Sequence, residues 1–351
     1  MKSSVLEFQR PAGLEAARPA EQRGLDRDEV RLLVSTDQGH RHGRFRDLPD
    51  FLPPGTLLVV NRSATLAASL PAERFEAGAS GRFLLNLATP YGGDLWLAEP
   101  RRSAAEPGPV GLEAGERFRA AGLDARLVSF HPQLPRLAFV ELSGDLERAR
   151  ERFGRPIRYG YVEAPFPSLE DYQTVFAREP GSAEMPSAGR PFTRRVLEAL
   201  EERGIGVAQI TLHTGVSSLE VETEAVEDHP LPPEPFEVSR STAQAVEAAR
   251  REGRPVVAVG TTVIRALESA WDGCRVRPAR GFTRIFLHPP EPLHVVDGLI
   301  SGFHDPRASH LAMLYALASP ELIRDAYREA VSARYLWHEF GDSHLILPKA
   351  A

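Results

Sequence analysis

Short, mostly apolar runs alternate with amphipathic stretches along much of the chain. The clearest runs are Leu57–Val60, Val207–Leu212 and Val256–Val259, and glycine, proline or polar residues bound each of them. Such runs are typical of strands that are buried on both faces of a sheet. Apolar residues recur at helical spacing between the later runs, so the pattern predicts an α/β fold in which strands and helices alternate.

Residues that begin and end helices locate the helical segments. We predict that Thr193 caps a helix with Val196, Leu197 and Leu200 on its apolar face, and that Gly204 ends it. Three further helix starts carry similar signals: a capping box at Ser241 and Gln244, an N-cap followed by proline at Asp305-Pro306 for a helix to about Ala318, and the same pair at Ser319-Pro320 for the last helix.

The texture changes between about residues 63 and 145, where helical periodicity is poor. Two pairs of short runs are separated by turn signals: Arg82–Ala88 with Leu95–Glu99 across Gly92-Gly93-Asp94, and Ala125–Phe130 with Leu137–Leu142. We therefore expect a mixed α/β catalytic domain made of residues 1–62 and 146–351, with an inserted β-barrel-like domain at residues 63–145.

The charge balance limits the kind of partner that the surface can hold. The 351 residues include 42 basic and 48 acidic side chains, which gives a net charge of −6. A general nucleic-acid binder usually has a basic excess, so any RNA contact must use a local patch. Candidates are the basic stretches Arg41–Arg46, Arg190–Arg195 and Arg275–Arg284, for which ordinary solvated surface is the alternative.

Cysteine content and hydropathy limit the cellular compartment in which the protein is expected. Cys274 is the single cysteine, which excludes an intrachain disulfide framework and a cysteine zinc site. The N-terminal residues lack the apolar core of a signal peptide, and no run approaches the ~18 apolar residues that span a bilayer. We expect a soluble, cytoplasmic protein with no membrane partner; the sequence does not indicate its oligomeric state.

A strand, a tight turn and a helix start follow one another within Val256–Ser269. Gly260 and Thr261-Thr262 form the predicted turn, and Arg265 lies one turn into the helix. A helix N-terminus offers unpaired N–H groups, and ligands of α/β sheets bind at the carboxyl ends of strands. Thr261, Thr262 and Arg265 can therefore hold a carboxylate or a phosphate; helix capping with an exposed arginine is the compatible alternative.

Three ionisable residues near strand ends are candidates for catalysis. His213 directly follows a strand and can titrate in a cleft, or it is a loop histidine bonded to the backbone. His304 precedes the predicted helix start at Asp305, whose positive end is expected to lower the histidine pKa; packing in a capping loop is the alternative. Asp297 lies among apolar neighbours, so it either belongs to a site or anchors the next loop.

Other polar positions give weaker indications. Glu227-Asp228-His229 place three ionisable groups side by side, but neighbouring residues do not share a face and a surface turn is the simpler interpretation. His213, His229, His294 and His304 show no metal-ligand spacing, so we expect no bound metal. The chain lacks a Walker loop, a GxGxxG fingerprint and a G-x-S-x-G elbow, which argues against NTPase, dinucleotide-binding and hydrolase functions.

Short motifs between about Phe45 and Leu347 occur in a specific order. They are Tyr172–Phe176, similar to Y-Q-T-V-Y/F; Pro186–Gly189, similar to P-T/S-A-G; Ile210–His213 with Gly215, similar to T-L-H-x-G; and Glu227–His229, Val257–Ser269, Val295–Asp297, Phe303-His304 with Pro306, and Tyr335 with Gly341-Asp342. In this order they resemble the S-adenosylmethionine:tRNA ribosyltransferase-isomerases, enzymes of the queuosine pathway.

The resemblance implies a fold and a reaction. Members of this family have an α/β domain and a β-barrel domain, and they use S-adenosylmethionine as a ribosyl donor without a metal. The ribosyl moiety is transferred and isomerised onto a 7-aminomethyl-7-deazaguanine base in tRNA, which gives epoxyqueuosine and releases adenine and methionine. The implied partners are S-adenosylmethionine, as a co-substrate, and the tRNA anticodon stem-loop.

Such a reaction needs a base, a purine pocket and an anchor for the methionine carboxylate. The base removes a proton from C5′ beside the sulfonium; His213 or His304 can serve, and Asp297 is a third catalytic candidate. Thr261-Thr262 and Arg265 match the anchor. The resemblance adds substrate-binding candidates from the other motifs: Tyr172, Gln173, Gly189, Glu227, Asp228, His229 and Phe303.

Several motif positions depart from the family pattern. Arg190-Pro191 stands where the family has L-H, and Leu231–Glu234 replaces M-H-S-E. Phe303–His310 replaces F-H-L-P-[KE]-S-T-L, and Tyr335 with Gly341-Asp342 are the matches to Y-R-F-F-S-Y-G-D-A. These changes leave an alternative open: a paralogue that uses S-adenosylmethionine or a related nucleoside with a different acceptor, such as a small molecule.

Overall fold

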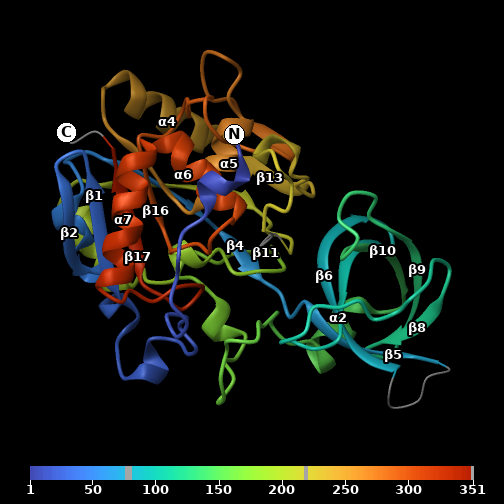
Figure 1. Cartoon of the computed structure of the whole chain (residues 1–351). Helices are drawn as coiled ribbons and strands as arrows, with labels where there is room; N and C mark the ends of the chain where they lie inside the picture. Colours follow the sequence, from blue (N-terminus) through green and yellow to red (C-terminus); the bar gives the residue numbers. More distant parts are fainter. Residues whose placement is uncertain (76–80, 217–219, 349–351) are drawn as a thin grey trace.

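The computed structural model describes residues 1–75, 81–216 and 220–348, and it shows an α/β body with a β-barrel beside it (Figure 1). The body contains the N- and C-terminal parts of the chain, and one continuous stretch between them forms the barrel. The predicted fold class, an α/β domain with a barrel-like domain, is therefore confirmed. The residue limits assigned to the two domains remain a prediction.

A nine-stranded mixed sheet runs through the body in the order β15-β13-β12-β3-β14-β16-β17-β1-β2. The bounds are β1 Arg31–Thr36, β2 Gly39–Arg44, β3 Leu57–Asn61, β12 Gly206–Leu212, β13 Glu234–Val238, β14 Val256–Val259, β15 Ala279–Thr283, β16 Gly298–Ser301 and β17 Ser343–Leu347. β12, β3, β14 and β16 are parallel to one another, whereas β17 pairs antiparallel with β16. The carboxyl ends of the four parallel strands therefore meet along one edge of the sheet.

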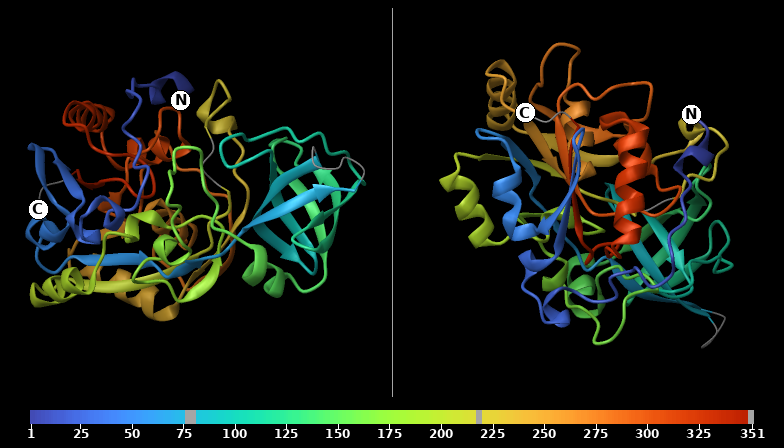
Figure 2. Two further views of the ribbon diagram at one scale, coloured as in Figure 1. Left: turned by 90° about the horizontal axis from the view of Figure 1, so that it is seen from below. Right: turned by 60° about the vertical axis from the view of Figure 1, so that its left-hand side comes forward.

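Helices cover both faces of this sheet (Figure 2). Their bounds are α1 Leu48–Phe51, α3 Arg194–Glu202, α4 Arg240–Arg251, α5 Thr261–Ser269, α6 Ser309–Leu317 and α7 Pro320–Ser332. Side chains alternate between the faces along a strand, so Leu58 of β3 packs in a core with Val196 of α3, and Val59 packs in another with Val246 and Ile264. Within the described ranges, no helix is long and apolar enough to cross a bilayer.

Six strands close the barrel in the order β10-β7-β6-β5-β8-β9. They are β5 Ser69–Arg74, β6 Arg82–Gly92, β7 Leu95–Arg101, β8 Arg117–Ala120, β9 Leu123–Phe130 and β10 Ala138–Ser143, followed by α2 Leu146–Phe153. Both predicted strand pairs are present as antiparallel neighbours, β6 with β7 and β9 with β10. The parallel pair β4 Ser63–Thr65 and β11 Glu179–Ser182 lies where the chain leaves the body and returns to it.

Two predicted helix caps are confirmed. The Thr193 hydroxyl accepts a hydrogen bond from the Val196 N–H at 3.3 Å and caps α3. The Ser319 hydroxyl does the same for the Leu322 N–H at 3.2 Å, with Pro320 as the first residue of α7. In both helices a hydroxyl satisfies one of the unpaired N–H groups at the helix N-terminus, so the local sequence is enough to locate the start.

The predicted capping box at Ser241 is wrong by two residues. Ser239 is the N-cap of α4, and its hydroxyl accepts from the Thr242 N–H at 3.1 Å. Ser241 lies inside the first turn, where its hydroxyl is 2.9 Å from that of Ser239. Two serines at this spacing offer the same signal, and the one that follows the end of β13 directly is used.

The predicted helix start at Asp305-Pro306 is also wrong, because α6 begins at Ser309. The Asp305 carboxylate lies 3.0 Å from Arg10 Nε and 3.6 Å from His338 Nε2, so it does not face the helix N–H groups. Arg307 has a φ of +61°, which turns the chain before the helix. Asp305 is thereby directed into the site described next.

Candidate active site

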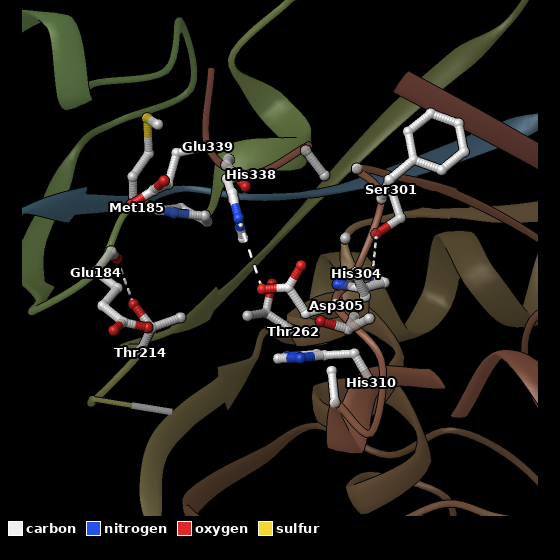
Figure 3. A pocket seen from close by; sticks show the side chains of 18 of the residues that line it. Glu184, Met185, Thr214, Thr262, Ser301, His304, Asp305, His310, His338 and Glu339 are labelled. Atoms are coloured by element: carbon white, nitrogen blue, oxygen red, sulfur yellow. Dashed lines mark hydrogen bonds and ion pairs between the residues drawn. The ribbon is translucent and has the colours of Figure 1, made fainter. Parts of the chain in front are cut away.

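A pocket of about 450 Å³ opens where the parallel strands β14 and β16 end (Figure 3). This is a usual volume and place for a ligand site in an α/β sheet. One group of lining residues, which we name the helix wall, consists of Gly260–Thr262, Arg265 and Ser301–His304. A second group of lining residues, which we name the ring wall, consists of Tyr159, Tyr161, His338 and Glu339, and His338 meets Asp305 at 3.6 Å between the two groups.

Gly260 allows the tight turn at the base of the helix wall. Its φ of +96° is in the left-handed region that favours glycine, and an added Cβ would lie 3.4 Å from the Ala188 Cβ. The Gly260 N–H donates to the Ile300 carbonyl at 2.8 Å, which ties the turn to β16. Thr261 and Thr262 therefore begin α5 at the pocket, as predicted from the sequence, and Thr262 accepts from the Asn61 amide at 3.3 Å.

Arg265 brings unsatisfied hydrogen-bond donors to the helix wall. One guanidinium nitrogen, Nη1, pairs with the buried carboxylate of Glu234, whose other oxygen accepts from the Gly215 N–H at 2.7 Å. Nε and Nη2 of Arg265 are buried and have no hydrogen-bond partner among the described residues. Unpaired buried donors are costly unless a ligand accepts from them, so this end of the pocket suits a carboxylate.

His304 lies in the same wall and is held as a neutral imidazole. Its Nε2 is 2.9 Å from the Ser301 hydroxyl, and its ring stacks on His310 at 4.8 Å. Burial places the His304 pKa well below its usual value, and the neighbouring histidines His310, His344 and His338 lower it further. A lowered His304 pKa was expected from the sequence, but the expected cause was the positive end of a helix that begins at Asp305. Because α6 begins at Ser309, burial and the neighbouring histidines are the causes instead.

His213 does not line the pocket, although its neighbour Thr214 does. Its Nδ1 is 2.8 Å from the Ser63 hydroxyl, which is 2.6 Å from that of Ser182, and the ring packs directly on Gly181. Burial lowers its pKa. His213 thus lies at the β4–β11 pair behind the pocket surface, where it can position Thr214.

Asp297 lies at the opposite edge of the sheet from the pocket. Its carboxylate accepts a hydrogen bond from the Val256 N–H at 2.9 Å, and its own N–H donates to the Val256 carbonyl at 2.8 Å. Val256 begins β14 and Asp297 immediately precedes β16, so this exposed residue ties the amino ends of two strands together. The geometry matches the alternative in which Asp297 anchors a loop.

Three further candidates support the pocket wall without lining it. The Gln173 side chain bridges the backbone of Thr65, accepting from its N–H at 3.0 Å and donating to its carbonyl at 2.8 Å. The Tyr172 ring is buried edge-on against Phe340 at 5.0 Å. Gly189 ends the short helix Ser187–Gly189, whose first two residues line the pocket.

The remaining candidates divide between the pocket and a turn that does not line it. Phe303 lines the helix wall and stacks on His344 at 5.4 Å. Glu227 pairs with the N-terminal amine of Met1, and Asp228 is exposed beside it. His229 is buried against Phe286, with ring centroids 5.9 Å apart. The Glu227–His229 turn does not line the pocket.

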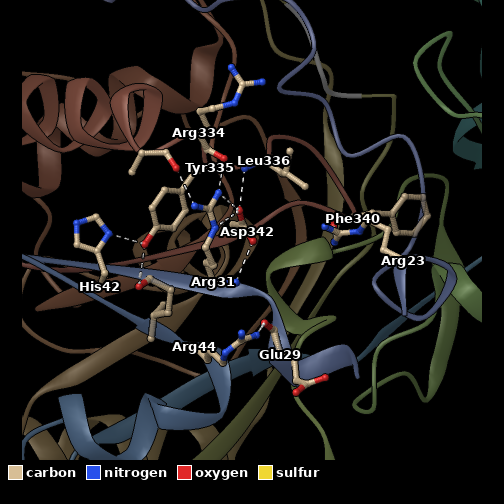
Figure 4. A network of polar contacts seen from close by, with 12 residues as sticks. Arg23, Glu29, Arg31, His42, Arg44, Arg334, Tyr335, Leu336, Phe340 and Asp342 are labelled. Atoms are coloured by element: carbon tan, nitrogen blue, oxygen red, sulfur yellow. Dashed lines mark hydrogen bonds and ion pairs between the residues drawn. The ribbon is translucent and has the colours of Figure 1, made fainter. Parts of the chain in front are cut away.

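A polar network fixes the segment that carries His338 and Glu339 (Figure 4). Asp342 accepts from the Arg31 N–H at 2.9 Å and from the Leu336 N–H at 2.8 Å, and it pairs with the Arg31 guanidinium at 3.0 Å. A Cβ at Gly341 would lie 2.4 Å from the Leu336 carbonyl, so only glycine fits. The Gly341-Asp342 motif therefore shapes the ring wall from behind.

The sequence analysis did not identify several ionisable residues of the pocket. They are Arg10, Glu15, Tyr159, Tyr161, Glu184, Glu220, Asp305, His310, His338 and Glu339. Asp305, His310, His338 and Glu339 occupy positions where the quoted family motifs have L, L, F and S. Those departures were the available signal: four apolar or small motif residues are replaced by ionisable ones, and all four face one cavity.

Metal and nucleic-acid features are weak in the described parts of the chain. Those residues contain no group of three histidine, cysteine, aspartate or glutamate side chains placed to hold a metal ion. The predicted basic stretches are partly neutralised by acidic partners, in the pairs Arg46–Glu29, Arg190–Glu21, Arg195–Asp28 and Arg277–Asp272. Neither feature identifies an RNA-binding surface.

Comparison with known proteins gives a consistent result. Residues 3–346 match the family model described as queuosine biosynthesis protein. The chain is 39% identical over 351 residues to the S-adenosylmethionine:tRNA ribosyltransferase-isomerase of Rubrobacter xylanophilus, covering 99% of this chain and 98% of that protein. It is 39% identical over 335 residues to the protein of the same name from Thermus thermophilus, covering 93% and 95%.

A solved structure also has this fold. The S-adenosylmethionine tRNA ribosyltransferase of Thermotoga maritima matches with a TM-score of 0.54 at 26% sequence identity, over 98% of this chain and 100% of that one. The family resemblance indicated by the motifs is thereby confirmed.

Proposed function

The chain belongs to the queuosine biosynthesis protein family of ribosyltransferase-isomerase enzymes, and we propose that it transfers the ribosyl moiety of S-adenosylmethionine to tRNA. The acceptor is a 7-aminomethyl-7-deazaguanine base, and the product is epoxyqueuosine, with adenine and methionine released. One observation supports this best: a helix N-terminus, free guanidinium donors and a neutral histidine share one pocket at the strand ends.

The helix wall is the proposed donor site. The methionine carboxylate accepts from the free Nε and Nη2 of Arg265, and the first turn of α5, with Thr261 and Thr262, adds N–H groups and a partial positive charge. Glu234 holds the guanidinium in place from behind. The Phe303 ring is buried against Tyr335, Trp337 and His344, so it supports the wall behind His304 and does not itself face the ligand.

His304 is the proposed base. The sulfonium acidifies the neighbouring C5′–H of S-adenosylmethionine, and a neutral imidazole in the pocket can remove that proton. The Ser301 hydroxyl at Nε2 and the His310 ring fix the imidazole in one orientation. Of the two histidines named from the sequence, His304 lines the pocket and His213 lies behind it, so we assign His213 to positioning Thr214.

A second candidate function keeps the donor site but changes the acceptor. Asp305, His310, His338 and Glu339 line the pocket where the family motifs have uncharged residues, which is the observation that favours a different, small-molecule acceptor. The acidic net charge of −6 also favours a small-molecule acceptor over RNA. The family membership favours the tRNA reaction over this alternative.

The test is adenine release. The purified protein is incubated with S-adenosylmethionine and either an anticodon stem-loop carrying the aminomethyl deazaguanine or an unmodified stem-loop. We expect free adenine and a mass increase of the modified nucleoside, both only with the modified RNA. Absence of adenine and of any mass change would refute the proposed function, and donor binding without RNA-dependent adenine would favour the second candidate.

A further inference from the structure

Glu339 is a partly buried residue of the pocket, and one of its two carboxylate oxygens has no partner in the described parts of the chain. Its Oε2 is buried and has no hydrogen-bond partner among the described residues. Burial raises the Glu339 pKa to about 7, and a hydrogen bond from its own backbone N–H opposes this in part. The Arg31–Asp342 network fixes the backbone segment that carries Glu339. A buried carboxylate oxygen without a partner is unfavourable in isolation, which indicates a ligand that supplies a cation or a donor to Oε2.

The rest of the ring wall is aromatic. Tyr161 stacks on His338 with ring centroids 4.3 Å apart and an angle of 11°, and Tyr159 continues the stack at 6.3 Å and 20°. His338 has a φ of +70°, an uncommon backbone conformation for a residue with a side chain. Parallel rings beside a carboxylate suit a flat heterocycle that carries a positive charge. The ring faces can stack on the heterocycle, and they also attract the positive charge.

Neighbouring charges do not neutralise Glu339. Arg27 and Arg190 line a smaller neighbouring cavity together with Glu339, but both pair with Glu21, each at 2.9 Å. Tyr159 donates to Glu184, which adds a second carboxylate to this end of the pocket. The pocket is therefore electrostatically divided, with free donors at Arg265 in the helix wall and a free acceptor at Glu339 in the ring wall.

We propose that Glu339 binds the cationic amine of the acceptor base, with the ring of that base lying against the Tyr159–Tyr161–His338 stack. This inference rests on the proposed function and assigns the two substrates to different walls of one pocket. The quoted family motif has serine at this position, so the contact belongs to this chain rather than to the shared reaction. S-adenosylmethionine also carries an amine, so the test must separate the two sources.

The test compares Glu339→Gln and Glu339→Ser with Glu201→Gln, an exposed position on α3. With saturating S-adenosylmethionine, we expect the KM for the aminomethyl stem-loop to rise at least tenfold in both Glu339 variants, with kcat changed less than threefold. Calorimetric affinity for S-adenosylmethionine alone should be unchanged in all three variants. An unchanged KM would overturn the inference, as would weaker S-adenosylmethionine binding in the Glu339 variants, because the amine would then be the donor's.

A ligand without the positive charge allows the inference to be tested by binding alone, without measuring turnover. A stem-loop with a hydroxymethyl in place of the aminomethyl group is neutral and nearly isosteric. Wild-type protein should bind the amine form at least tenfold more tightly, and Glu339→Gln should bind both forms equally. Retained discrimination in Glu339→Gln would overturn the inference. Because this comparison needs only binding, it gives an answer even if the wild-type protein releases no adenine.

Discussion

The two walls of the pocket differ in their unsatisfied groups and in their sequence motifs. The helix wall keeps the motif residues Thr261, Thr262 and His304, and it offers free donors from Arg265. The ring wall carries an ionisable residue where the quoted motif has serine, and it offers a free acceptor from Glu339. The difference agrees with the proposal that donor and acceptor are recognised by separate groups, although motif departures lie beside both walls, with Asp305 and His310 next to His304 and with His338 and Glu339 in the ring wall.

The largest effect is expected from His304→Gln, which keeps a hydrogen-bonding side chain but removes the base. Turnover should fall by about 10²–10⁴-fold, the usual contribution of a general base. His213→Gln is the matched control because His213 lies behind the pocket, and it should lose less than tenfold. Adenine release at saturating substrates measures both. An equal or larger loss in His213→Gln would mean that the base is assigned to the wrong histidine.

Arg265→Lys is expected to have the next largest effect. Lysine keeps a charge beside Glu234 but cannot supply the guanidinium fork, so affinity for S-adenosylmethionine should fall by roughly 10–100-fold, the range for one or two hydrogen bonds to a charged group. Calorimetry measures this, with Arg203→Lys on the surface as the control. Unchanged affinity would remove Arg265 from the donor site.

Acid should destabilise the protein through two buried histidines, His310, which stacks on His304, and His344, which stacks on Phe303. Burial lowers the pKa of His310 to about 4 and that of His344 to about 3, so the folded protein binds fewer protons than the unfolded chain below pH 6.5. These two histidines contribute fully to stability above about pH 6.5, and their contribution is lost as the pH falls toward 4. The expected loss is on the order of a few kcal/mol for each histidine, in proportion to its pKa shift.

Urea unfolding between pH 7.5 and 4.5 measures this loss. His310→Leu, which restores the motif residue, should flatten the dependence, whereas the exposed His294→Leu should leave it as in the wild type. An equally steep pH dependence in His310→Leu would show that other groups cause the acid sensitivity.

The smallest effect is expected from Asp297→Asn. Asparagine keeps an oxygen that can accept from the Val256 N–H at the amino edge of the sheet, so adenine release should remain within about twofold of the wild type. A loss comparable to that of His304→Gln would contradict the separation between the pocket edge and the opposite edge.

Local sequence was sufficient to predict a feature of the structure where one short segment determines that feature. The Gly260-Thr261-Thr262 turn follows from a buried run, a glycine and a helix start, and it lies at the pocket as predicted. The paired barrel strands followed from turn signals in the same way.

Sequence reasoning was insufficient where distant segments decide the outcome. Asp305-Pro306 has the local form of a helix start, but Arg10 and His338 draw the carboxylate into the pocket. Asp297 has the local form of a site residue, yet the sheet places it at the edge opposite the pocket. Glu339 gave no signal except a mismatch to a motif, because its importance depends on burial that only the folded chain creates.

The most direct test of the divided pocket is calorimetric titration with S-adenosylmethionine, without RNA, of the wild type, Arg265→Lys and Glu339→Gln. Our account predicts that Arg265→Lys binds the donor at least tenfold more weakly and that Glu339→Gln binds it as the wild type does. Weaker donor binding in Glu339→Gln together with unchanged binding in Arg265→Lys would contradict the assignment of the two walls.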